Sequence, residues 1–135
     1  MEAILKKNGV LNKDISEVVA SMGHTDMIMI CDAGLPFPSG VRRIDLAITK
    51  GVPGFIQTTE VIADELKIDH VIVADELSTV SPHILMELRR IFNNVEIESI
   101  PHEKLKELSQ KTKAIIRTGE FTPYANVILV SGVLF

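Results

Sequence analysis

Short apolar runs alternate with amphipathic segments along this 135-residue chain, and that alternation constrains the fold more than any other feature. Asn12 is a suitable N-cap for a helix over 13–22 that ends at Gly23, and the apolar run 27–31 predicts a buried strand. Further strands are predicted at 44–48, 70–74, 95–100, 114–117 and 126–135, and further helices at 55–66, 82–91 (with Ser81 as its cap) and 102–108. Such alternation is typical of a three-layer α/β/α fold with a largely parallel, mixed central sheet.

The length and composition fit one globular domain over residues 1–135, without repeats or linkers. A net charge of -4 without a block of Lys or Arg argues against a nucleic-acid surface. No apolar run reaches the roughly 18 residues of a membrane span, and the first residues do not resemble a signal peptide. The single cysteine, Cys31, excludes an internal disulfide. We therefore expect a cytoplasmic protein with neither nucleic acid nor membrane as a partner.

The sequence contains none of the common cofactor signatures. It lacks G-x-G-x-x-G, the P-loop pattern, C-x-x-C and H-E-x-x-H. Its four histidines lie too far apart along the chain to suggest a structural zinc site. The sequence therefore predicts neither a metal nor a cofactor.

A histidine and a carboxylate flank the predicted strand 27–31. Gly23-His24-Thr25-Asp26 precedes the strand, and Asp32-Ala33-Gly34-Leu35-Pro36 follows it. Histidine is suited to proton transfer near neutral pH, and sites in parallel sheets lie beyond the carboxyl ends of the strands, where Asp32 is placed. Taken alone, each residue has an equally good structural interpretation, His24 as a capping residue and Asp32 as a turn former.

Two spacings add polar residues to this set. His102 and Lys106 are four residues apart, so on a helix they lie on one side, although His102 is equally suited to cap that helix. Tyr124 and Asn126 are two residues apart, so on an extended chain they share a face. The surrounding segment 117–126 is rich in hydrogen-bonding groups and poor in positive charge. It therefore suits a small neutral polyhydroxy ligand better than a phosphate.

Four segments together resemble the family of ribose pyranases and fucose mutarotases. They are Asn8-Gly9-Val10-Leu11-Asn12, the two segments that flank strand 27–31, and Arg117-Thr118-Gly119-Glu120-Phe121-Thr122-Pro123-Tyr124-Ala125-Asn126. The resemblance runs from about Lys7 to Phe135. It implies that the chain interconverts the pyranose and furanose forms of D-ribose by acid/base catalysis of hemiacetal opening and reclosure, and so helps to supply ribose to its kinase.

The resemblance also implies a role for each matching residue. His24 falls where the family has its proton donor. The implied sugar-binding residues are Asp32, His102, Lys106, Tyr124, Ala125 (through its backbone) and Asn126. Whether Asp32 orients an imidazole or accepts a hydrogen bond from a sugar hydroxyl stays open.

Family members form rings, commonly decamers of two stacked pentamers with sites between neighbouring subunits, so the resemblance implies a homodecamer. The apolar segment 127–135 is either a central buried strand or in part an interface. Two other functions are compatible with the sequence. One is a fucose-type mutarotase that acts on anomers, and the other is a non-catalytic sugar-binding accessory protein of ribose transport, in which His24 serves structure.

Overall fold

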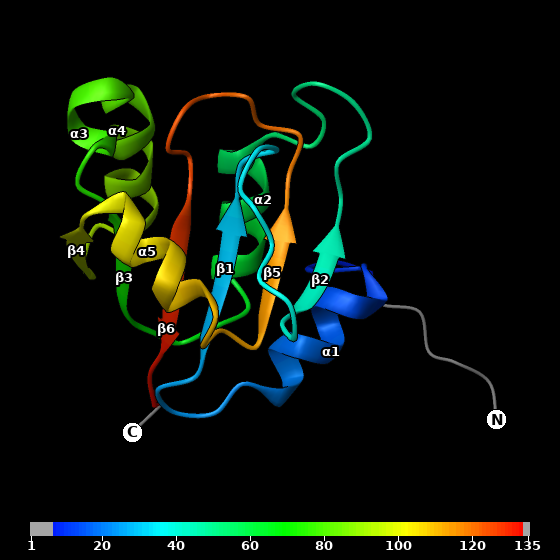
Figure 1. Ribbon diagram of the computed structural model, residues 1–135. Helices are drawn as coiled ribbons and strands as arrows, with labels where there is room; N and C mark the ends of the chain where they lie inside the picture. Colours follow the sequence, from blue (N-terminus) through cyan, green and yellow to red (C-terminus); the bar gives the residue numbers. More distant parts are fainter. Residues whose placement is uncertain (1–6, 134–135) are drawn as a thin grey trace, which may run out of the picture.

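The computed structural model describes residues 7–133 and contains one six-stranded sheet in the order β2-β5-β1-β6-β3-β4 (Figure 1). Its strands are β1 (Met27–Cys31), β2 (Arg42–Asp45), β3 (Ile68–Ala74), β4 (Glu96–Ile100), β5 (Ala114–Arg117) and β6 (Val127–Ser131). Its helices are α1 (Lys13–Ser21), α2 (Phe55–Ala63), α3 (Leu77–Val80), α4 (Pro82–Ile91) and α5 (His102–Ser109). All strand pairs are parallel except those that β6 makes with β1 and β3. The predicted mixed, largely parallel sheet is therefore confirmed.

Helices cover both faces of the sheet, which confirms the three-layer prediction. In Figure 1, α5 lies in front of the sheet and α2 behind it. Side chains of α1, α2 and α4 pack in one apolar cluster with Ile28 and Ile30 of β1. Met29 and Cys31 point to the opposite face, where they join Leu105 of α5 and Leu35 of the following loop. Because both faces of β1 are covered, the strand is apolar at every position.

The apolar C-terminal segment is a central strand. β6 pairs with β1 on one side and β3 on the other, and all five of its residues are buried. This decides between the two interpretations of that segment in favour of a buried strand. Residues 134 and 135 of the predicted strand lie outside the described residues.

Several predicted boundaries were wrong. β2 ends at Asp45, because the Asp45 side chain accepts the Ala47 N–H at 3.0 Å and turns the chain, which leaves Ile48 80% exposed. α2 ends at Ala63 rather than at 66, and the single turn α3 was not predicted. Ser81 does not cap α4 through its side chain, since its hydroxyl donates to the Pro123 carbonyl at 2.7 Å.

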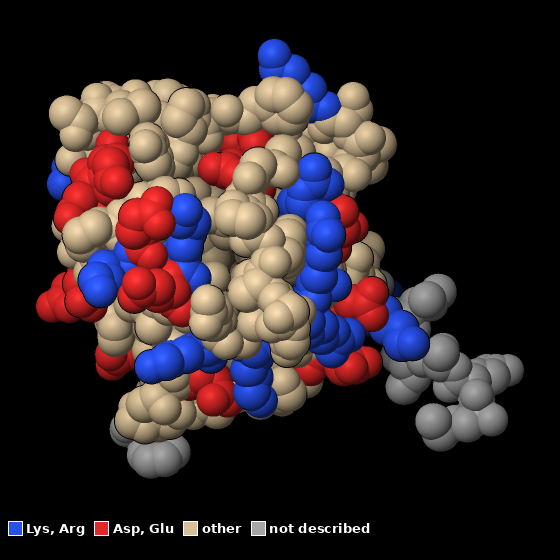
Figure 2. Space-filling view, viewed as in Figure 1, with Lys and Arg blue, Asp and Glu red and all other residues tan. Residues whose placement is uncertain are grey.

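Arg42 on the edge strand of the sheet forms ion pairs with a helix. Arg42 of β2 binds Asp14 at 3.2 Å and Glu17 at 2.8 Å, both from α1. Figure 2 shows basic and acidic side chains mixed on the left of the view, and a stripe of basic side chains with acidic neighbours beside it on the right. Within residues 7–133, no helix has the length and apolar character that crossing a membrane requires.

Candidate active site

A pocket of about 510 Å³ opens beyond the carboxyl end of β1. Four of the residues predicted from the sequence line it together: Asp32, His102, Lys106 and Tyr124. They come from the loop after β1, from α5 and from the loop between β5 and β6. Parallel strands place their carboxyl ends at one edge of the sheet, so these loops meet there.

Asp32 is held by backbone and amide groups. Its Oδ1 accepts the Gly34 N–H at 3.0 Å, and its Oδ2 accepts the Asn126 Nδ2–H at 3.2 Å. Burial raises the pKa of the Asp32 carboxyl above its ordinary value, although these two hydrogen bonds oppose the shift. No hydrogen bond joins Asp32 to His102 within residues 7–133, so the structure does not support Asp32 as the residue that orients this imidazole.

Asn126 lies behind Asp32 rather than on the wall of the pocket. Its side chain is fully buried, and its Oδ1 accepts the Asp32 N–H at 2.9 Å. Tyr124 has a φ of 63°, which breaks the extended pattern expected for Tyr124 and Asn126. The prediction that these two side chains share a face was therefore wrong. Ala125 is also fully buried, and its N–H closes a turn to the Thr122 carbonyl at 3.3 Å.

His102 begins α5 and packs against Tyr124. The two rings meet edge to face, with centroids 5.0 Å apart and planes at 82°. The backbone N–H of His102 donates to Glu76 Oε1 at 3.0 Å, and the N-cap is Pro101, so His102 does not cap the helix. Its Nδ1 is buried without a partner among the described residues.

Lys106 lies one turn along α5 on the same side as His102, as its spacing predicts. Its Nζ is paired with Glu103 at 3.0 Å, and its side chain is 33% exposed. The ammonium group therefore remains accessible at the edge of the pocket.

The lining residues that were not predicted as site residues include Arg117, Glu120 and Phe121. Arg117 Nε donates to the Ala33 carbonyl at 3.0 Å, and its Nη1 pairs with Asp45 at 3.1 Å. All three lie in the polar segment 117–126, but that segment contains so many hydrogen-bonding groups that composition alone does not rank them.

Glu120 connects the pocket to the start of α2. Its Oε1 accepts the Phe55 N–H at 3.0 Å, and its Oε2 accepts the Thr122 hydroxyl at 2.6 Å. Gly54, the N-cap of α2, has no side chain to cap the helix. Glu120 therefore supplies the missing acceptor at the helix N-terminus, where a negative charge is favourable.

We expect Glu120→Gln to flatten the dependence of stability on pH. Burial acts to raise the pKa of Glu120, but the hydrogen bonds from Thr122 and Phe55 outweigh it and hold the pKa below the ordinary 4.5. The carboxylate thus stabilises the fold above pH 4.5, and acidification removes this contribution. Urea unfolding should show a loss of about 1 kcal/mol in the variant at pH 7 that shrinks toward pH 3. A constant difference between the two proteins at both pH values would contradict this account.

His24 lies at the opposite edge of the sheet. The segment that joins α1 to β1 runs below the sheet in Figure 1, whereas the loops after β1 and β5 lie above it. A five-residue strand is about 17 Å long, and β1 lies between His24 and Asp32. His24 is exposed and makes no hydrogen bond or ion pair with residues 7–133. The structure does not bring it to the pocket of its own chain.

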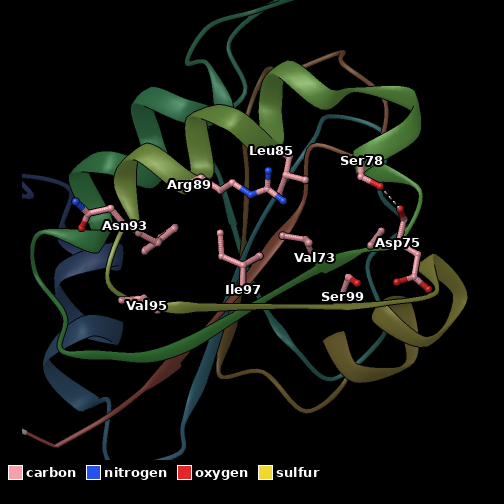
Figure 3. Close-up of a pocket in the computed structure, with 11 residues that line it drawn as sticks. Val73, Asp75, Ser78, Leu85, Arg89, Asn93, Val95, Ile97 and Ser99 are labelled. Carbon is pink, nitrogen blue, oxygen red and sulfur yellow. Dashed lines mark hydrogen bonds between the residues drawn. The ribbon is translucent and has the colours of Figure 1, made fainter.

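A second hollow of about 570 Å³ lies between α4 and the strands β3 and β4, and contains none of the predicted site residues. Figure 3 shows Arg89 of α4 lying over Val73 and Ile97, with Asn93 and Asp75 at opposite ends. Aliphatic side chains and the Arg89 guanidinium therefore share the middle of this hollow. The pocket beyond β1 is the one that contains residues predicted from the sequence.

The chain matches the model of the RbsD / FucU transport protein family over residues 5–134. It is 50% identical to the D-ribose pyranases of Clostridium perfringens and Bacillus licheniformis, over 131 residues that make up 97% of this chain and 100% of each relative. The solved structure of Bacillus subtilis RbsD complexed with D-ribose is 48% identical, with a TM-score of 0.93 over 96% of this chain and 99% of that chain. The fucose mutarotase in complex with L-fucose from Streptococcus pneumoniae is 26% identical, with a TM-score of 0.77 over 92% and 94% of the two chains.

Proposed function

The chain belongs to the RbsD / FucU transport protein family, and we propose that it is a D-ribose pyranase, an enzyme that interconverts the pyranose and furanose rings of D-ribose. The observation that carries this proposal is the similarity to D-ribose pyranases, at 50% identity over the full length of those relatives. The similarity to the fucose mutarotase is lower, at 26% identity, which favours ribose over fucose.

The proposed reaction needs only proton transfers and a held substrate. Opening the pyranose breaks the bond between C1 and the ring oxygen, while the anomeric hydroxyl loses a proton and the ring oxygen gains one. The C4 hydroxyl then adds to the C1 aldehyde, with the reverse proton movements, to form the furanose. One positioned acid/base group contributes about 10²–10⁴-fold to the rate, and orientation of the open chain contributes more.

In this proposal the pocket holds the sugar and His24 delivers the proton. Asp32 accepts a hydrogen bond from a sugar hydroxyl, the role left by its contacts to Gly34 and Asn126. His102 donates from its ring, and Lys106 donates from the rim. Asn126 and Ala125 are fully buried, so in this proposal they act from behind the wall of the pocket.

A homo-oligomer follows from the same proposal, because His24 is a strand length away from the pocket of its own subunit. We propose the decamer of two pentameric rings, with His24 of one subunit completing the pocket of its neighbour. The region around the pocket offers exposed apolar side chains for such a contact. Phe121 on the pocket wall is 61% exposed, and Val52 of the preceding β2–α2 loop is 46% exposed. Lys50 Nζ lies over the Phe121 ring, 5.3 Å from the ring centroid.

We further propose that residues 1–135 act as one domain in the cytoplasm. Support for a single domain comes from β6, the last strand, which lies in the middle of the sheet. Support for the compartment comes from the single cysteine, Cys31, which is buried and free.

Saturation-transfer NMR on D-ribose tests the proposal. The wild-type protein should speed the exchange between pyranose and furanose signals, and His24→Ala should lower that rate by about 10²–10⁴-fold. His70→Ala, on β3 and outside the lining of the pocket, is a matched control that should behave as wild type. Equal rates for wild type and His24→Ala would rule out His24 as the proton donor. Faster turnover of L-fucose than of D-ribose would reassign the protein to the mutarotases, and ribose binding without faster exchange would favour the accessory protein.

A further inference from the structure

The backbone around His24 is held by more contacts than a surface turn needs, although the His24 side chain itself has none. The Asp26 N–H donates to the Gly23 carbonyl at 3.1 Å, which closes the turn over residues 23–26. Asp26 Oδ2 accepts the Gly23 N–H at 2.8 Å, so the same two residues are joined twice. The turn therefore displays an exposed imidazole on a fixed backbone.

Asp26 also links the turn, through Lys113, to the start of β5 and the end of α1. Its Oδ2 lies 3.3 Å from Lys113 Nζ, and Lys113 Nζ donates to the Ser21 carbonyl at the end of α1 at 2.8 Å. The Gly23 N–H lowers the pKa of the Asp26 carboxyl, burial opposes this shift, and Lys113 adds to the lowering. The carboxylate is thus ionised near neutral pH, and its hydrogen bonds are charge-assisted.

The other side of the turn is fastened to β6. The Thr25 N–H donates to the Ser131 carbonyl at 2.9 Å, and the Ser131 N–H donates to the Asp26 carbonyl at 2.9 Å. Thr25 has a φ of 71°, in the left-handed region that a β-branched residue rarely adopts. Such conformations persist only where the surroundings impose them, and they gather at functional sites.

We infer that Asp26 is the positioning residue for His24, holding the 23–26 turn so that the imidazole enters the pocket of the neighbouring subunit. This inference rests on the proposed function. Asp26 itself touches no substrate in this arrangement and acts through the backbone of Gly23 and Thr25. A proton donor that reaches across an interface needs such support, because a misplacement of about 1 Å can cost about 10²-fold in rate.

Kinetics of ring exchange in the purified oligomer test this role. Asp26→Ala should lower kcat by about tenfold to a hundredfold while the KM for ribose stays within about twofold, because the pocket is untouched. Asp26→Asn keeps an oxygen that can accept the Gly23 N–H and should recover most of the rate. Asp14→Ala removes an exposed ion pair to Arg42 elsewhere and should leave kcat unchanged.

A double-mutant cycle separates positioning from general damage. On a His24→Ala background, Asp26→Ala should cause no further loss, since it acts only through His24. A full additional loss there, or equal effects on kcat and KM, would overturn the inference. If Asp26→Ala has the wild-type rate while His24→Ala is inactive, the inference about Asp26 is overturned and the proposed function is not. An active His24→Ala would instead overturn the catalytic role proposed for His24.

Mixed oligomers provide a second measurement that does not depend on the stability of the isolated variant. Asp26→Ala subunits retain an intact pocket, so co-assembly with Asp32→Ala subunits, whose 23–26 turn is intact, should raise the rate per Asp26→Ala pocket. If co-assembly with Asp32→Ala subunits raises the rate of His24→Ala subunits but not that of Asp26→Ala subunits, the defect of Asp26→Ala is not confined to the turn.

Discussion

Subunits of two inactive variants, His24→Ala and Asp32→Ala, are expected to regain ring-exchange activity when they assemble together. The reason is geometric: β1 separates the two residues within one chain, and they lie at opposite edges of the sheet. If the site is shared, a mixed ring pairs the intact pocket of a His24→Ala subunit with His24 of an Asp32→Ala neighbour. About a quarter of the sites in an equal mixture are then complete, since a head-to-tail interface takes its two halves from different subunits.

Co-expression of the two variants with different tags, followed by NMR exchange on the doubly purified oligomer, measures this effect. The expected result is a rate near a quarter of wild type, against about 10²–10⁴-fold less for the His24→Ala parent. A mixture of Asp32→Ala and Lys106→Ala is the control. Both lesions lie in the pocket, so no site becomes complete. No recovery in the first mixture, with mixed oligomers verified by mass spectrometry, would rule out the shared site.

Gly119→Ala is expected to destabilise the fold by about 3 kcal/mol, the upper part of the range for overpacking. A Cβ at Gly119 would lie 2.5 Å from the Thr49 carbonyl oxygen and 2.7 Å from the backbone nitrogen and oxygen of Val52. These are backbone atoms, which a rotamer change does not move. Gly119 also bonds this loop directly, since its N–H donates to the Pro53 carbonyl at 2.9 Å.

Urea unfolding at pH 7 measures the loss in stability, with Gly54→Ala as the matched control. A Cβ at Gly54 has its nearest neighbours at 3.8 and 3.9 Å, so the control should lose less than about 1 kcal/mol. Because Gly119 adjoins Glu120 on the pocket wall, the Gly119→Ala variant should also bind ribose more weakly. Equal unfolding midpoints for the two variants would show that the loop yields at little cost.

Local patterns predicted the elements that position the pocket. The apolar run 27–31 is β1, with Asp32 beyond its carboxyl end, and the four-residue spacing of His102 and Lys106 places both on one side of α5. These predictions succeed because burial on both faces of a strand, and the helical repeat, are written in neighbouring residues. The bounds of β2 were missed because a side chain, Asp45, ends the strand through a contact that no hydrophobic pattern encodes.

Contacts between distant segments decided the rest of the site. Asn126, whose predicted contact with sugar stays a prediction, holds Asp32 from 94 positions away in the chain. Glu120 contacts the start of α2, 65 positions away, and was not predicted as a site residue from the sequence. The left-handed Tyr124 breaks a face that an extended chain would have kept. Such pairings depend on which loops converge, and that depends on the order of strands in the sheet.

By itself the sequence determined the α/β class, the central apolar strand and the family, because residue periodicity and short motifs carry that information locally. The sequence also placed His24 and Asp32 at the two ends of that strand, and only the tertiary structure decided that the other residues of the pocket gather at the Asp32 end. The physical reason is that an extended strand separates its two ends by its full length. The two residues are close in sequence but far apart in space. The fold instead brings Asp32 together with residues of α5 and the β5–β6 loop.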